Sequence, residues 1–376
     1  MLEIPEVMCY NTEVKILAIE SSCDETAAAI ISGDPSSKNG KAELLSNVVV
    51  SQIDIFKSYG GVIPEVAARS HLEAILPVVH QAFSEAGLTK NSQDDWSQID
   101  AIAVTHTPGL LGSLLIGTLT ARTLAILHDK PLYAVHHLKS HIYANWLTDN
   151  EDEKQPQFPL LSLVVSGGHT QIIRMDEHNH FEIIGTTMDD AVGECYDKIA
   201  KILGLPYPGG PSIARAAKNG DPDKYKLPIP QIKDLDFSFS GLKTAVLRAV
   251  QKELGVPISF PSHELAGKLT EQQKADFAAS FQKTATRILL NKLEKALEMY
   301  PDTKSIVIAG GVSANEDLRK TALAEFGNKT EVFFPALKFA GDNAAMVGAA
   351  AFYEIASGVS PTDPYKLNIM PRSEII

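Results

Sequence analysis

The sequence predicts an α/β protein made of two halves, each a mixed β-sheet flanked by helices. Apolar runs of strand length alternate with helical patterns in the order β-β-β-α-β-α, and a second copy of this order can be read after residue 158. Short turns join the first three strands of each half, which favours antiparallel pairing beside parallel strands. Two strand patterns also end in paired glycines, at Gly167-Gly168 and Gly310-Gly311.

Each element of the first half has its own signal. Helical spacing of Leu72, Ile75, Leu76, Val79 and Phe83 predicts a helix that begins near Pro64. Pro108-Gly109 precedes a long helical pattern that ends at about His128. The predicted strands of this half are 14–20, 26–32, 43–51, 99–104 and 132–135.

The second half repeats the pattern with more helix between its strands. The apolar stripe from Glu271 to Met299 predicts one long helix. The polar stretches Gly33–Lys41 and Thr148–Gln157 predict surface loops. We expect an N-terminal lobe at 14–135, a C-terminal lobe at 136–357 with a helical insertion at about 190–300, and a tail at 358–376. The other predicted elements are strands at 160–166, 169–175, 181–187, 305–309 and 331–334, and helices at 315–325 and 342–357.

Composition excludes several classes of protein. The chain is 44% hydrophobic and 21% charged, which is ordinary for a globular protein. It has no uncharged apolar run of membrane-spanning length, so no membrane association is expected. Its start lacks a signal-peptide pattern. The three cysteines, Cys9, Cys23 and Cys195, have no zinc-site spacing and fit a reducing compartment, so we expect a cytoplasmic protein.

The charge distribution points to a possible nucleic-acid surface. The net charge of −12 alone argues against such a partner, because phosphate contacts dominate nucleic-acid affinity. The window 198–252, however, holds ten Lys or Arg and four Asp, a net +6. A local basic surface on an acidic protein is compatible with nucleic-acid binding, and a solvated face with chance asymmetry is the alternative.

The two glycine turns are candidate phosphate sites. Bare backbone at Ser166-Gly167-Gly168 lets a ligand approach main-chain N–H groups. The second turn continues through Asn315 into a helical pattern, whose N-terminal N–H groups would face an anion. Two such turns suggest two halves that close on one phosphate-bearing ligand. The alternative is that each is only a tight turn.

A histidine pair predicts a metal site. His137 and His141 follow a strand and stand four residues apart, so both imidazoles share one helix face. Asp342, directly before an apolar helix, is the best candidate for a third ligand. A set of two histidines and one carboxylate suits iron(II), zinc or manganese and leaves positions open for substrate oxygens. Helix-surface histidines are the alternative.

Two further segments carry candidate acids. In the turn from Glu20 to Thr26, Asp24 and Glu25 lie between two apolar strands and could serve as bases, although this motif by itself favours a polar hairpin turn. Asp197 lies on a predicted helix near the turn at 207–211 and could accept hydrogen bonds from ribose hydroxyls. A surface aspartate is the alternative there.

Taken together, these motifs resemble the TsaD family, the bacterial tRNA adenosine threonylcarbamoyltransferase subunit, which is related to the archaeal and eukaryotic Kae-type proteins. The resemblance spans roughly Ile16 to Ile355. It rests on the following segments: 19–26 (IESSCDET), 59–65 (YGGVIPE), 108–114 (PGLLGSL), 136–141 (HHLKSH), 164–170 (VVSGGHT), 207–211 (YPGGP), 237–244 (FSFSGLKT) and 309–315 (AGGVSAN).

The resemblance implies an actin/Hsp70-like (ASKHA) fold with two lobes around a nucleotide cleft. It implies transfer of a threonylcarbamoyl group from threonylcarbamoyl-AMP to the exocyclic amine of the adenine adjacent to the anticodon, in tRNAs that read ANN codons. It also implies one divalent metal per subunit, iron(II) first and zinc as the alternative, and as partners tRNA, a TsaB-type paralogue and a TsaE-type ATPase. The implied metal ligands are His137, His141 and Asp342, and the implied substrate-contacting residues are Val164, Val165, Ser166, Gly167, Gly168, Asp197, Gly210 and Asn315.

Some positions depart from the family pattern. Ala340-Gly341 replaces the usual Cys-Thr or Cys-Ser before the metal aspartate, Lys139 replaces a usual Glu, and Phe56 a usual His. We take Asp24 and Glu25 as candidate catalytic residues. An ATP-dependent phosphotransferase of the same fold, a metalloprotease and a non-catalytic scaffold of a modification complex are the alternatives. The phosphotransferase leaves the histidine pair unexplained, and the protease lacks a glutamate base in the histidine motif.

Overall fold

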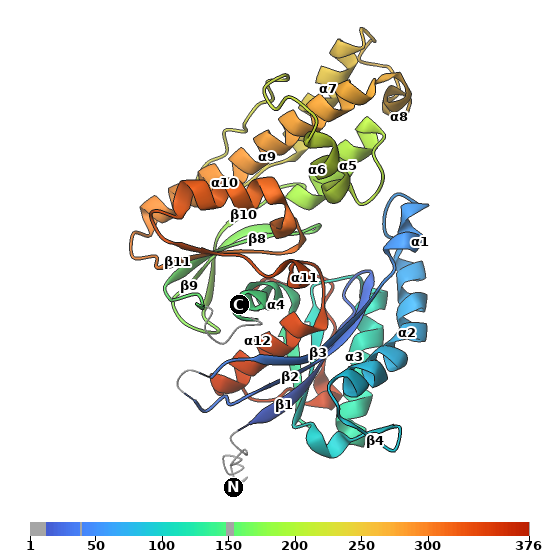
Figure 1. Ribbon diagram of the computed structural model, residues 1–376, viewed down its shortest axis with the longest axis vertical. Helices are drawn as coiled ribbons and strands as arrows, with labels where there is room; N and C mark the ends of the chain where they lie inside the picture. The colour runs from blue at the N-terminus through green and yellow to red at the C-terminus, as the bar shows by residue number, and fades with distance from the viewer. Residues whose placement is uncertain (1–12, 38–39, 148–153, 376) are drawn as a thin grey trace. The chain divides into compact units, whose positions relative to one another are not determined.

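The computed structural model describes residues 13–37, 40–147 and 154–375 (Figure 1). The chain divides into two compact units. The first unit comprises Met1–Ser51, Pro64–Glu151 and Asn343–Ser373, and the second comprises Gln52–Ile63, Asp152–Asp342 and Glu374–Ile376. Each unit contains one five-stranded mixed sheet with helices against it.

The first sheet has the strand order β3-β2-β1-β6-β7. Its first three strands are antiparallel, and β1, β6 and β7 are parallel. Side chains alternate between its faces, because Leu17 and Ile19 pack in the core with α2 and α3 whereas Ala18 lies against α12. The elements are β1 (Val14–Glu20), β2 (Glu25–Gly33), β3 (Glu43–Ser51), β6 (Ala101–Thr107), β7 (Leu132–His136), α2 (Pro64–Glu85), α3 (Leu111–Leu127), α4 (His137–Tyr143) and α12 (Ala344–Ala356).

The second sheet repeats this topology, in the order β10-β9-β8-β11-β12. Again three antiparallel strands come first and two parallel strands follow. The duplicated order of elements and the mixed sheets predicted from the sequence are therefore confirmed. The strands are β8 (Leu160–Val165), β9 (Thr170–Met175), β10 (Phe181–Thr186), β11 (Ser305–Ala309) and β12 (Glu331–Phe333).

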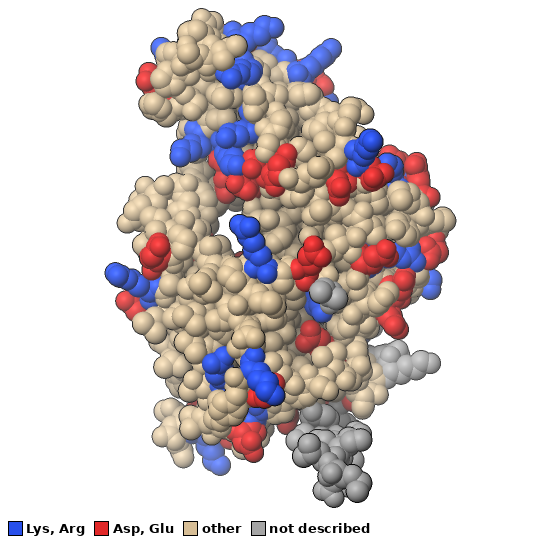
Figure 2. Space-filling model, turned by 180° about the vertical axis from the view of Figure 1, so that it is seen from behind, with Lys and Arg blue, Asp and Glu red and all other residues tan. Residues whose placement is uncertain are grey.

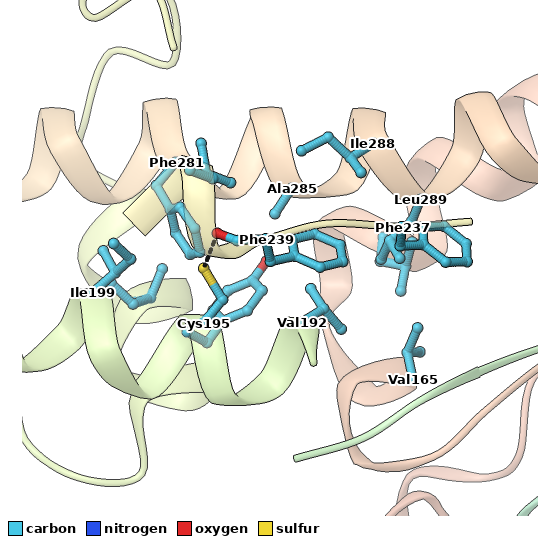
Figure 3. Packing of buried hydrophobic residues seen from close by; sticks show 14 of the residues in the cluster. Val165, Val192, Cys195, Ile199, Phe237, Phe239, Phe281, Ala285, Ile288 and Leu289 are labelled. Atoms are coloured by element: carbon cyan, nitrogen blue, oxygen red, sulfur yellow. Dashed lines mark hydrogen bonds between the residues drawn. The ribbon is translucent and has the colours of Figure 1, made fainter. Parts of the chain in front are cut away.

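The helices of the second unit enclose an aromatic and aliphatic core beside this sheet. Figure 3 shows Phe239 and Phe281 beside Cys195, with Phe237 further along the same core next to Leu289. The Cys195 thiol donates to the Phe239 carbonyl at 3.7 Å. Burial raises the pKa of the Cys195 thiol to about 12, so this cysteine is a packing residue. The helices are α5 (Val192–Leu203), α6 (Gly209–Ala217), α7 (Ser240–Glu253), α8 (Ser262–Leu265), α9 (Glu271–Met299), α10 (Glu316–Phe326) and α11 (Leu337–Ala340).

The division into units differs from the lobes expected at 14–135 and 136–357. Helix α4 continues directly from β7 and stays with the first sheet, and α12 returns to it from the end of the second unit. The reason is packing: α12 contacts β1, β2 and α4, and its residues from Ala344 to Glu354 are buried. An apolar helix pattern does not say which of two sheets it will cover.

Short elements also escaped the sequence pattern. These are helix α1 (Ile53–Lys57) and the hairpin of β4 (Thr89–Lys90) and β5 (Gln93–Asp94), which are too short to show a period. Residues 38–39 and 148–153 of the two expected loops, the expected absence of an N-terminal signal, and Cys9 lie outside the described residues. Within the described part of the chain, no helix is long and apolar enough to cross a membrane.

Candidate active site

The three predicted metal ligands lie close together in the structure. His137 and His141 lie on one face of α4, with their ring centroids 4.6 Å apart. The candidate ligand atoms of His137, His141 and Asp342 all lie within 4.8 Å of one another. Both histidines are buried and Asp342 is half-buried. This group could therefore hold a metal ion.

Local capping places these three side chains. His136 is the N-cap of α4 and accepts from the Leu138 N–H, which sets the helix start so that His137 is its first residue. Asp342 directly precedes Asn343, the N-cap of α12, whose side chain accepts from the Met346 N–H. Because α12 packs on α4, the aspartate is carried to the histidine pair by its own helix.

The chemistry of the group fits a divalent transition metal. Two imidazole nitrogens and one carboxylate suit iron, manganese or zinc. His137 Nδ1 lies 3.1 Å from Glu20 Oε2, and a metal-bound histidine typically makes such a contact through its second ring nitrogen. His136, next to the pair, does not compete as a charged group, because burial lowers its pKa to about 3.

The β1–β2 turn, which carries Asp24 and Glu25, is held by buried polar contacts of the first unit. His71 of α2 lies with Nε2 2.9 Å from the Cys23 carbonyl and Nδ1 2.8 Å from Thr26 Oγ1. Ser113 of α3 donates to the same carbonyl at 3.0 Å. Asp24 and Glu25 are half-buried, and Glu25 accepts from Ser51 Oγ at 3.1 Å.

In the second unit, the two glycine turns lie against each other. Gly310, at the end of β11, has φ +89, and a Cβ there would lie 2.5 Å from the Val165 carbonyl oxygen at the end of β8. Helix α5 begins on the same turn, since a Cβ on Gly193 would lie 2.5 Å from the Ser166 oxygen. Glycine is required at both positions, because the neighbour is backbone and has little room to move.

The turn after β8 exposes main-chain donors. Gly167 and Gly168 are exposed, and a Cβ on either would meet nothing within 4 Å. Among the described residues, no hydrogen-bond partner of either N–H is found, whereas Ser166 Oγ accepts from the His169 N–H. The side chains of Val164 and Val165 are fully buried in the sheet, so a ligand at this turn can reach only the backbone of these two residues.

The side chain of Asp197, on α5, reaches the start of α6, where Gly210 lies. Asp197 Oδ1 accepts from the Gly209 N–H at 2.6 Å, so this carboxylate caps the helix. Gly210 is half-buried, and a Cβ there would meet nothing within 4 Å. Asp197 therefore lies next to the glycine turn, as the sequence indicated, and its hydrogen bond to the Gly209 N–H stabilises the start of α6.

Asn315 also has a structural role that the sequence analysis missed. Its Oδ1 accepts from the N–H groups of Asp317 and Leu318, which makes it the N-cap of α10. Its Nδ2 donates to Gln282 Oε1 of α9 at 2.9 Å. Two of the α10 N–H groups that the sequence analysis assigned to an anion are thus already satisfied.

A cavity of about 410 Å³ lies near this contact in the second unit. Gln282, Lys283 and Thr286 of α9 line one side, and Asp317 of α10 lines another. Thr286 donates to Asp317 at 2.8 Å, which links the two helices at the cavity wall. Gln282 thus joins the cavity to Asn315, and its place on a helix surface gave no sequence signal for this role.

The family model and the sequence relatives agree on one family. Residues 43–349 match the model of the TsaD family, described as tRNA N6-adenosine threonylcarbamoyltransferase. The chain belongs to the TsaD family. The enzyme of that name from Symbiobacterium thermophilum is 47% identical over 93% of this chain and 94% of its own length. The one from Bacillus cereus (strain ATCC 10987) is 45% identical over 96% of both chains. The resemblance drawn from the motifs is therefore confirmed.

Solved structures show the same fold at low identity. HypF from T. kodakarensis matches with a TM-score of 0.59 and 14% identity over 92% of this chain and 49% of its own. A full-length HypF described as phosphate- and nucleotide-bound matches with a TM-score of 0.54 and 13% identity, over 93% of this chain and 47% of its own. The two-part α/β fold with mixed sheets flanked by helices, which the sequence predicts, is confirmed.

Proposed function

We propose that this protein transfers the threonylcarbamoyl group from threonylcarbamoyl-AMP to the exocyclic amine of the adenine adjacent to the anticodon, in tRNAs that read ANN codons. Near-full-length identity of 45–47% to enzymes of that name carries the proposal. The group formed by His137, His141 and Asp342 supports it independently, because a phosphotransferase of the same fold leaves this group without a role. The tRNA substrate favours a cytoplasmic location.

The reaction is an acyl-type transfer. The adenine nitrogen attacks the carbamoyl carbon, the bond from that carbon to the phosphate oxygen breaks, AMP leaves, and the amine loses a proton. The amine is a weak nucleophile, so the carbonyl must be polarised and the developing negative charge stabilised. We assign the proton acceptor or positioning role to Asp24 or Glu25, which the buried contacts of His71 and Ser113 hold in the turn.

We assign the metal site to His137, His141 and Asp342, with iron(II) first and zinc as the alternative. A divalent ion bound by these residues supplies positive charge that polarises a substrate oxygen. The residues themselves prepare the site in advance, since His137 begins α4, His141 lies one turn further along the same helix, and Asp342 directly precedes the N-cap of α12. A buried, preset ligand group costs little reorganisation when a substrate binds.

The second unit supplies the residues for the adenylate. The N–H groups of Gly167 and Gly168 can donate to phosphate or carbamoyl oxygens at an exposed turn. We place the ribose beside Asp197 and Gly210, where an acid lies next to an open glycine position. Asn315 acts by holding the turn and Gln282 in place, and the cavity lined by Gln282 has the room that a nucleoside needs. Val164 and Val165 contribute backbone alone.

We propose that tRNA contacts the basic window 198–252. Some basic side chains of this window are already paired with acids and so are less able to bind phosphate. Lys198 pairs with Asp190 and Glu194 at 2.7 and 2.9 Å, and Lys218 pairs with Glu316 at 3.2 Å. Lys and Arg side chains gather over the α7–α8 end of the second unit (Figure 2). Exposed Arg248 and Lys252 of α7 are therefore better candidates than Lys198.

We propose a TsaB-type paralogue and a TsaE-type ATPase as protein partners. The first unit offers an apolar surface for one of them, because exposed leucines form stripes on the packed helices α2 and α3. Leu72 and Leu76 on α2 are 66% and 61% exposed, and Leu111 on α3 is 59% exposed. Exposed leucines four residues apart on a helix are typical of a helix-on-helix interface.

The decisive experiment is an assay with synthetic threonylcarbamoyl-AMP and unmodified tRNA, with and without the two partner subunits. We expect the wild type to form the modified adenosine and Asp342→Asn to abolish its formation. A protein that yields no modified nucleoside in any combination, but cleaves or transfers the γ-phosphate of ATP, would be the phosphotransferase instead. Product formation that survives loss of His137 and Asp342 would refute the metal centre.

A further inference from the structure

Glu20 is a fully buried carboxylate whose two oxygens both accept hydrogen bonds. It is the last residue of β1 and has no solvent exposure. Its Oε1 accepts from the Ser22 N–H at 2.5 Å, and its Oε2 accepts from Thr105 Oγ1 of β6 at 2.6 Å. Burying a carboxylate is costly unless such donors compensate it, so its place here calls for a reason.

The third contact of this carboxylate is with His137, a candidate metal ligand. Oε2 lies 3.1 Å from Nδ1 of His137, and the Ser22 hydroxyl lies 3.3 Å from the same nitrogen. The main-chain N–H on Oε1 can only donate, and the short Thr105 contact places a hydroxyl donor on Oε2. Since the carboxylate thus acts as an acceptor, His137 Nδ1 must be the proton donor in the remaining contact.

That assignment fixes which nitrogen of His137 can bind a metal. A neutral imidazole that carries its proton on Nδ1 has its lone pair on Nε2. We propose that Glu20 is a positioning residue: it holds the His137 ring and its tautomer so that Nε2 is available as a ligand. This inference rests on the proposed metal centre and extends it to a residue 117 positions away in the sequence.

The Glu20 side chain connects the candidate metal ligand His137 to the β1–β2 turn that carries Asp24 and Glu25. Oε1 holds the backbone of Ser22, two residues before Asp24, while Oε2 holds the ring of His137. A carboxylate with two oxygens can make both contacts at once. An amide cannot, because one of its two positions is an NH₂ group that would face a donor.

The test is metal binding by Glu20→Gln, a variant of nearly the same size. Metal-free wild type and variant are titrated with Co²⁺ and Zn²⁺ against a chelator, and the Co²⁺ absorption bands report ligand geometry. We expect an affinity loss of about 10- to 100-fold, the range found when such a histidine partner is removed. The matched control is Glu354→Gln, a second buried glutamate of the first unit, on α12, which should bind within about threefold of wild type.

A second measurement needs no variant. Nitrogen-15 shifts of labelled histidine in the metal-free wild type report the tautomer of His137, identified by comparison with His137→Gln. We expect the Nδ1–H form, and the Nε2–H form would overturn the proposal even if Glu20→Gln fails to fold. Equal metal affinity of wild type and Glu20→Gln would overturn it as well.

The metal centre and the positioning role of Glu20 can be refuted separately. A wild type that binds neither Co²⁺ nor Zn²⁺ refutes the proposed metal centre, and with it the purpose assigned to Glu20. A wild type that binds metal while Glu20→Gln binds it equally well leaves the centre intact and refutes the positioning role alone.

Discussion

Substituting Gly310 by alanine tests whether the two glycine turns of the second unit must touch. At φ +89 an L-residue is strained by about 1 to 2 kcal/mol. The added Cβ would also lie 2.5 Å from the carbonyl oxygen and 2.9 Å from the carbonyl carbon of Val165. Overpacking against a neighbour that cannot rotate away costs about 1 to 3 kcal/mol more. We therefore expect a loss of about 2 to 5 kcal/mol.

The matched control is the next residue. A Cβ on Gly311 would meet nothing within 4 Å, so Gly311→Ala should be nearly neutral. Thermal unfolding should show a midpoint lower by roughly 10 °C for Gly310→Ala and little change for Gly311→Ala. Binding of AMP or a stable adenylate analogue should weaken in the first variant only. Equal behaviour of the two variants would refute the close contact on which the proposed adenylate site depends.

Three further predictions concern the metal-binding group, a buried glutamate and the apolar surface of α2. Asp342→Asn should abolish stoichiometric iron or zinc binding and lower transferase activity at least 100-fold, measured by metal analysis and tRNA nucleoside analysis. Burial raises the pKa of Glu354 from 4.5 to about 7. The folded protein therefore retains a proton that the unfolded chain releases, and the free energy of unfolding of the wild type falls as pH rises through this range. Relative to wild type, Glu354→Gln should gain up to about 3 kcal/mol between pH 4.5 and 8, measured by urea unfolding. Leu72→Glu should weaken binding of the TsaB-type paralogue at least 10-fold by calorimetry, because it places a charge in the apolar stripe.

Each of these has its own control. Exposed Asp54→Asn should keep metal and activity, and parallel loss in both variants would contradict the assignment of Asp342. Exposed Glu65→Gln should show no such pH-dependent gain, and a flat difference for Glu354→Gln would contradict its buried charge. Leu323→Glu on α10 of the second unit, at a 50% exposed leucine, should leave paralogue binding unchanged.

Much of the fold was predictable because its signals are local. A buried strand must be apolar along its length, and a helix must repeat its apolar positions, so the strands of both sheets and the long helix α9 followed from the pattern. The spacing of His137 and His141 likewise belongs to one helix turn. The apolar pattern after Asp342 marked a helix start, which placed a carboxylate at a helix end.

The remaining features depend on contacts between distant residues. Glu20 reads in sequence as the polar end of a strand, and nothing near it points to His137, 117 residues away. Asn315 was expected to serve a ligand, because an N-cap and a ligand contact call for the same side chain. The return of α12 to the first sheet was missed because helical periodicity identifies the buried face of a helix without identifying its partner.

The return of α12 also constrains how the protein is made. The strands of the first sheet and α4 leave the ribosome early, but the helix that covers Ala18 and contacts α4 follows only after the long segment of the second unit that ends at Asp342. Until then an apolar face of the first sheet stays uncovered, and such a face is a site for aggregation or chaperone binding. Asp342 arrives with that helix. After His141 has been made, about 200 further residues are synthesised before Asp342, and the metal-binding group is complete only when α12 packs against α4.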